Sequence, residues 1–386
     1  MKAFSLFEKT STTLGGIYVM LMVNRMQILY FTLIMPMYLV HSYMIWGIVA
    51  IGMLSQINLM ILSRVFASGY PAKGYQGFRQ LFGEPMIRFF AFIGLFLIVF
   101  KMTIITLGYA DIIHQFLFAT MHSNWLLFFI FLISVIVASH GMENTIRFIV
   151  IAFLSSMLII TIFVFFFFMK IGSLQDLYPL IPTDWSMHSL KGLLLIGSSF
   201  SGPEYLICLG PWLNLKQKMS KYWAVGNALT ILEYLLFFVT SLLFFGSNYL
   251  SKTSFPVVNM VRYLQSPIFE RIDIILICIE LFNYIFFIAI LLLFFYGAFR
   301  IIGGRIHEQT TRIGFMSSCI TIFVCMMAIY TWFWESEPEQ NIWFNIQIWL
   351  GAFTYFLVPA FLLVSINPKE RVDDRMFFPI FGEQYN

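Results

Sequence analysis

A polar break inside an apolar segment constrains this chain more than any other feature. Residues 191–212 are long and apolar enough to cross a bilayer, yet residues 197–204 at their centre are Gly-Ser-Ser-Phe-Ser-Gly-Pro-Glu. Proline lacks the N–H that an interior helical position donates, but it suits the first position of a new helix. The pattern therefore predicts two half-helices, about 191–198 and 203–212, with unwound backbone between them.

Unwound backbone at this depth is tolerated only where it is buried in protein or lines a cavity. Secondary transporters hold their substrates at such discontinuous helices. The composition agrees, because 60% of the residues are hydrophobic and only 11% are charged, against roughly 25% charged in soluble domains. These values exclude a soluble globular domain and indicate a membrane protein with many spans. The sequence shows no catalytic motif, no metal-ligand spacing and no cofactor or nucleic-acid motif, so we do not expect an enzyme.

The hydropathy pattern predicts an all-α integral membrane fold of ten transmembrane helices. A polar segment, 170–189, divides the spans five and five. We therefore expect a first five-helix repeat at 14–169, an external linker at 170–189, a second repeat at 190–365 and a cytoplasmic tail at 366–386. The spans are expected at 14–38, 41–63, 89–118, 124–139, 146–169, 190–213, 221–246, 272–299, 312–334 and 341–365.

Two halves of five spans start on opposite sides of the membrane, which is the topology of an inverted repeat. The first span should then be broken like the sixth, its counterpart. It carries three polar side chains near its middle, Asn24, Arg25 and Gln27. The two halves show no direct sequence similarity, so the inverted repeat rests on this topology.

The distribution of basic residues predicts the orientation. With the N-terminus in the cytoplasm, sixteen of the 23 lysines and arginines fall inside and five outside, while Arg25 and Lys101 lie within spans. The opposite orientation would reverse this bias. We therefore expect both termini in the cytoplasm.

Two motifs resemble known families. The Phe-Ser-Gly-Pro-Glu of 200–204 is similar to the Phe-x-Gly-x-Glu signature of the amino acid–polyamine–organocation transporters. Pro256 and Glu270-Arg271-Ile272-Asp273 resemble the B-subunit family of spore germinant receptors, the GerB-type spore permeases. The resemblance implies a leucine-transporter-like fold with broken first and sixth helices. It also implies a multi-pass A subunit and a lipoprotein C subunit as partners in the spore inner membrane.

Arg25 lies in the middle of the first span, where an arginine costs roughly 2.5–3.5 kcal/mol on insertion scales. It should face the bundle and meet an acid, for which Glu204, Glu233, Glu280 and Asp111 are the candidates. Its guanidinium could clamp a ligand carboxylate, or it could form a permanent structural ion pair. The sequence favours neither.

Glu204 could accept a ligand ammonium, but we favour a contact with the free N–H groups of the second half-helix as part of its role. Lys101 either reaches the site or extends toward one membrane boundary. Glu280, Asn283 and Tyr284 share one helix face at i, i+3 and i+4.

Glu233, with Asn227 and Thr230 on the same face of the seventh span, fits a structural polar seam better. In sodium-coupled relatives the eighth span supplies hydroxyls to a cation site, but residues 274–299 contain no serine or threonine. The guanidinium of Arg25 is permanently charged, so it cannot bind and release protons as proton-coupled transport requires. We therefore expect a protein that binds a ligand without pumping it.

The sequence leads us to expect a nutrient-sensing subunit of a spore germinant receptor. A small nutrient, an amino acid, would bind at mid-membrane between the two breaks. Arg25 and the free N–H groups would hold its carboxylate, and the carbonyls of 198–201, with Glu204 or Glu280, its ammonium. The alternatives are an amino acid permease and a scaffolding subunit without a ligand. The candidate ligand-binding residues are Asn24, Arg25, Gln27, Lys101, Ser198, Ser199, Phe200, Ser201, Gly202, Glu204, Glu280, Asn283 and Tyr284.

Overall fold

The computed structural model describes most of the chain. The described residues are 5–8, 14–27, 29–166, 177–181, 187–213, 219–263, 271–335 and 341–377. Glu270 of the second motif, most of the predicted linker and the end of the predicted tail lie outside them.

The predicted all-α membrane fold is confirmed. Among the described residues, eight helical segments are long and apolar enough to cross a membrane, and a bent helix pair makes a ninth. The 17-residue helix α6 coincides with the predicted fourth span. Eight other helices are α3 (Met44–Ala67), α5 (Glu84–Phe116), α6 (Ser123–Ser139), α7 (Met142–Phe166), α9 (Met219–Leu250), α11 (Ile272–Ile302), α12 (Arg312–Phe333) and α13 (Ile342–Phe377). Of these, α9 has a kink at Gly246, where the backbone is not helical.

The first and sixth spans are both broken, as predicted. The first consists of α1 (Gly16–Arg25) and α2 (Leu29–Leu39), and the axis bends by 49° between them. The sixth consists of α8 (Met187–Ser199) and a second half, Pro203–Trp212. This second half, η3, is wound as a 3₁₀-helix rather than as the expected ordinary half-helix. Pro211 near its end has no N–H to donate in either kind of helix.

The two breaks touch each other through their backbones. Gly202 has a φ of 152°, and a Cβ built on it would lie 1.6 Å from the carbonyl oxygen of Met26. Only a residue without a side chain permits this approach. The unwound segments of the first and sixth spans therefore meet inside the bundle.

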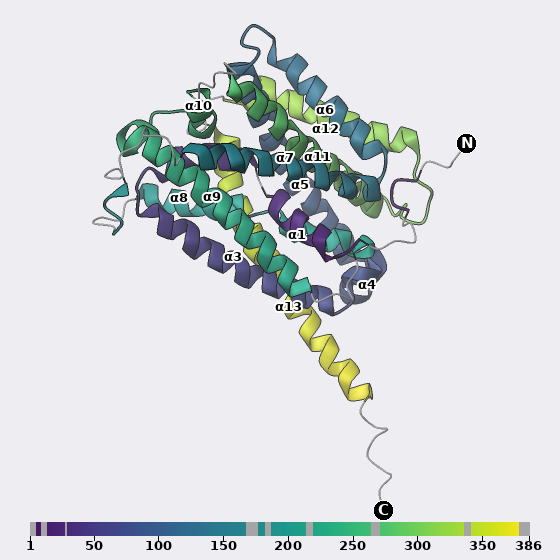
Figure 1. Ribbon diagram of the computed structural model, residues 1–386. Helices are drawn as coiled ribbons and strands as arrows, with labels where there is room; N and C mark the ends of the chain where they lie inside the picture. Colours follow the sequence, from purple (N-terminus) through teal and green to yellow (C-terminus); the bar gives the residue numbers. More distant parts are fainter. Residues whose placement is uncertain are drawn as a thin grey trace, which may run out of the picture.

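The buried core is built around α11, which packs against α5, α6 and α7 (Figure 1). Every residue from Tyr284 to Tyr296 on this helix is buried. Exposed apolar side chains gather on the outer helices, among them α3, α6 and α12. These helices present the surface that a bilayer requires.

Short elements close the two ends of the bundle. The helix α10 (Pro256–Arg262) packs on α2, α9 and α11, and the 3₁₀ turn η1 (Pro71–Lys73) and α4 (Tyr75–Phe82) lie at the opposite end (Figure 1). The last helix, α13, was predicted to end at 365, but it continues to Phe377 and projects beyond the bundle.

The first half of the first span is also joined to the second half of the sixth span. Leu14, just before α1, donates its N–H to the carbonyl of Trp212 at 3.0 Å and forms an isolated β-bridge with Leu213. The start of α1 is thus tied to the end of η3.

Gly202→Ala tests the contact between the breaks. The added methyl group would collide with the backbone at Met26, so we expect the free energy of unfolding to fall by about 2 kcal/mol or more. Gly94→Ala is the matched control, because no atom lies within 4 Å of the position that a Cβ on Gly94 would take. Thermal unfolding of the purified protein in detergent measures both. Equal unfolding temperatures for the two variants would contradict the contact.

Candidate functional site

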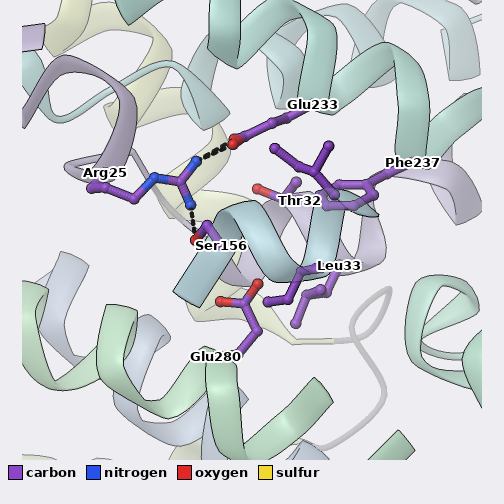
Figure 2. A pocket seen from close by; sticks show the side chains of 9 residues that line it. Arg25, Thr32, Leu33, Ser156, Glu233, Phe237 and Glu280 are labelled. Atoms are coloured by element: carbon purple, nitrogen blue, oxygen red, sulfur yellow. Dashed lines mark hydrogen bonds and ion pairs between the residues drawn. The ribbon is translucent and has the colours of Figure 1, made fainter. Parts of the chain in front are cut away.

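Arg25 is the last residue of α1, and its side chain is almost completely buried. Its Nε donates to Asn24 Oδ1 at 2.8 Å. One terminal nitrogen donates to Ser156 Oγ of α7, and the other donates to both carboxylate oxygens of Glu233 on α9 (Figure 2). The acid that meets Arg25 is therefore Glu233, and all three guanidinium nitrogens are engaged.

Further side chains connect the first break to the rest of the bundle. Asn24 Nδ2 donates to Thr230 Oγ1 at 3.1 Å and to Glu233 Oε2 at 3.3 Å. The amide of Gln27 turns back to the carbonyl of Asn24. The hydroxyl of Tyr234 lies 2.6 Å from Gln27 Oε1 and 2.8 Å from the carbonyl oxygen of Ser199. Tyr234 thus links the first break to the second.

A second buried cluster surrounds the break of the sixth span. Lys101 of α5 donates to Ser201 Oγ at 2.8 Å and to Glu204 Oε1 at 3.3 Å. Glu204 also accepts hydrogen bonds from Ser201 Oγ at 2.6 Å and from the backbone N–H of Gly202. Lys101 therefore reaches the break, and Glu204 binds the free backbone there, as we favoured.

A small cavity lies beside the Arg25–Glu233 pair (Figure 2). It has room for about one water molecule. Glu280 enters it from α11, where its Oε2 accepts a hydrogen bond from Asn283 Nδ2 at 2.9 Å. The same amide donates to Ser156 Oγ at 2.7 Å. The lining residues are Arg25, Thr32, Leu33, Ser156, Ile159, Ile160, Glu233, Phe237 and Glu280.

The other candidate residues contact neighbouring helices. Tyr284 stacks on Tyr109 of α5 with 3.8 Å between the ring centroids, and Phe200 packs on Tyr234. Ser198 Oγ donates to the carbonyl of Gln347 on α13, and Ser199 Oγ donates within its own helix. Of the predicted site residues, Arg25 and Glu280 thus line the cavity, and Asn24 and Asn283 form hydrogen bonds with residues of its wall. Lys101, Ser201, Gly202 and Glu204 form the second cluster.

Sequence reasoning missed several members of the site. Ser156 lies at the centre of the first cluster, and the adjacent hydroxyl residues at 155 and 156 in an apolar span were a signal for it. Thr32 and Tyr234 had no comparable signal. The three residues of the predicted polar seam on α9 have different partners. Thr230 and Glu233 accept hydrogen bonds from Asn24 at the first break, whereas Asn227 accepts one from Ser55 of α3.

The comparisons with known proteins point to one family. A family model described as spore germination protein matches residues 17–333. The spore germination protein GerQB of Bacillus cereus is 25% identical over 120 residues, which are 31% of this chain and 33% of that protein. The alignment therefore spans about one third of this relative's length.

Solved transporters share the fold. Mhp1, a nucleobase-cation-symport-1 family transporter in a closed conformation with bromovinylhydantoin bound, has a TM-score of 0.56 at 12% identity, covering 99% of this chain and 97% of its own. A mutant of the Eremococcus coleocola manganese transporter also has a TM-score of 0.56, at 13% identity, covering 91% of this chain and 77% of its own. These likenesses confirm the leucine-transporter-like fold of five plus five helices.

Lys101→Met tests the second cluster. It leaves Glu204 buried without its cationic partner, so we expect the free energy of unfolding to fall by about 3 kcal/mol. Adding Glu204→Gln should recover much of this loss. Lys73→Met, at an exposed position, should change it by less than about 0.5 kcal/mol. Thermal unfolding of the wild type, the single variants Lys101→Met, Glu204→Gln and Lys73→Met and the double variant measures these effects, and additive losses in the double variant would contradict the pair.

Proposed function

This chain belongs to the spore germination protein family, and we propose that it is the nutrient-binding subunit of a germinant receptor. The single observation that carries the proposal is the position of Arg25. It lies at the break of the first span, next to the break of the sixth, on the wall of a buried cavity. An arginine at mid-membrane is costly, and discontinuous helices are where proteins of this architecture bind small molecules.

The ion pair suggests how an amino acid would bind. Its carboxylate would replace Glu233 on the guanidinium of Arg25, which forms bidentate bonds with either group. Its ammonium would then take the place of the guanidinium beside the released carboxylate of Glu233, near Glu280 and the carbonyls of 198–201. A zwitterion can split a buried ion pair in this way without leaving an unpaired charge, whose burial would be strongly unfavourable.

The exchange would also produce a signal. The Arg25–Glu233 pair joins α1 to α9, and the start of α1 is tied to the end of η3. A ligand that loosens the pair would favour a different arrangement of both broken spans. We propose that the A and C subunits of the receptor detect this movement in the spore inner membrane, with both termini of this chain in the cytoplasm.

A second candidate function is an amino acid permease, because the solved proteins that share the fold are transporters. Uptake of labelled glycine or L-alanine into proteoliposomes, abolished when a proton or sodium gradient is collapsed, would favour the permease. Failure of the purified protein to bind any amino acid would favour the scaffolding subunit.

Arg25→Gln tests the carboxylate clamp. Loss of a charge-assisted hydrogen bond of about 1.5–3 kcal/mol corresponds to a loss of roughly 10- to 150-fold in affinity. The amino acid dose-response of germinating spores should therefore shift to higher concentrations by at least about tenfold. Calorimetry on the purified protein measures the binding step directly.

Two further variants separate binding from folding. The double variant, Arg25→Gln with Glu233→Gln, removes both charges and so leaves no unpaired buried charge. It still lacks the guanidinium that would bind a carboxylate. Arg147→Gln makes the same substitution at a half-exposed ion pair of α7 and should leave the dose-response unchanged. An unchanged dose-response in Arg25→Gln would remove the clamp from this mechanism.

A further inference from the structure

One buried carboxylate at the cavity has no cationic partner. Six acidic side chains are buried among the described residues, and four of them form salt bridges with lysine or arginine. Asp111 and Glu280 instead accept hydrogen bonds from neutral donors, the indole of Trp334 at 2.8 Å and the amide of Asn283 at 2.9 Å. Of these two, only Glu280 lines the cavity.

The charges around the cavity do not balance. Arg25 and Glu233 cancel each other in direct contact, so an ionised Glu280 would leave one buried negative charge. The ionisable groups that face Glu280 are Arg25, Glu233, Tyr109 of α5 and Tyr284 of its own helix, while α7 contributes the neutral Ser156. None supplies a free positive charge. A buried ion without such a partner becomes neutral instead.

The space restricts which cation can restore the balance. The cavity holds about one water molecule, which leaves no room for a hydrated metal ion or an organic cation. The Thr32 residue is 95% buried, its hydroxyl lies beside that of Tyr234, and Figure 2 shows the side chains of Thr32 and Glu280 around the same cavity. A carboxylic acid O–H could donate to this hydroxyl through one water, whereas an ionised carboxylate has no proton to donate.

We infer that the cavity beside Arg25 is a proton-binding site, with Glu280 as the group that carries the proton. Building on the proposed function, we further infer that this proton is taken up together with the nutrient. A zwitterion adds no net charge, so the occupied, water-free site still requires one positive charge. The empty site also opens to water, and above the pH at which Glu280 ionises there, the ligand-free protein lacks the proton that the occupied, closed site requires. Nutrient binding therefore strengthens as the pH falls.

The first experiment needs no ligand. At low pH, infrared difference spectra between the wild type and Glu280→Gln should show the carbonyl stretch of a protonated carboxyl group, lost in the variant and, in the ligand-free wild type, as the pH rises. Gln keeps the acceptor for Asn283, so the fold should persist, and Glu280→Asp should retain a shifted carboxyl band. Asp111→Asn, which changes the other carboxylate without a cationic partner, should leave the Glu280 band in place. Absence of the band in the wild type would overturn the proton site.

The second experiment measures the linkage with glycine and L-alanine as probes. Calorimetry in two buffers of different ionisation enthalpy, at a pH above that at which the infrared band of the ligand-free protein disappears, should show uptake of up to about one proton per ligand bound, and Kd should rise by about tenfold per pH unit in that range. Glu280→Gln mimics the protonated acid, so it should remove both the uptake and the pH dependence and bind more tightly than the wild type at high pH. Asp111→Asn should keep both.

The outcomes separate the two proposals. If the wild type binds neither probe nor any other amino acid, the nutrient-binding function fails, while the infrared band still decides the proton site. If a probe binds with no proton uptake, or with proton release, the linkage is wrong and the binding function stands. Binding that requires sodium rather than low pH would also overturn the assignment of a proton.

Discussion

The structure depends on the partners that unwound backbone finds in the middle of a membrane. Lipid offers no hydrogen bonds, so each peptide group that leaves a helix must be bonded inside the protein. At the break of the sixth span, the side chains that bond the unwound backbone include one from α9 and one from the break itself. Tyr234 of α9 reaches the carbonyl at the end of α8, and the carboxylate of Glu204 takes the N–H of Gly202. These bonds satisfy the unwound backbone at the break of the sixth span.

Each break also holds one buried ion pair, Arg25 with Glu233 and Lys101 with Glu204. Buried pairs contribute little net stability compared with apolar side chains of similar size, yet removal of one partner is strongly destabilising. A chain selected only for stability would have no need of them. Their location at the two points where helices are interrupted indicates a role in recognition or switching.

Much of the architecture could be predicted from the sequence, because spans are set by length and hydropathy and breaks by proline, glycine and polar residues at mid-membrane. The shared face of Glu280 and Asn283 follows from helical spacing alone. The acid that meets Arg25 could not be chosen, since four acids lay on other spans and helix rotation decides among them. Thr32 and Tyr234 have side chains common in any span. Their role exists only after α2 and α9 are packed.

The winding of η3 has a mechanical consequence. Runs of 3₁₀-helix beyond three or four residues are uncommon, and η3 has ten. At about 2.0 Å per residue it extends roughly 20 Å, while an α-helix of the same residues would extend roughly 15 Å. Rewinding this segment as an α-helix would therefore shorten the distance between Gly202 and the β-bridge at Leu14 by up to about 5 Å, although Pro211 cannot donate the hydrogen bond that an α-helix would require there.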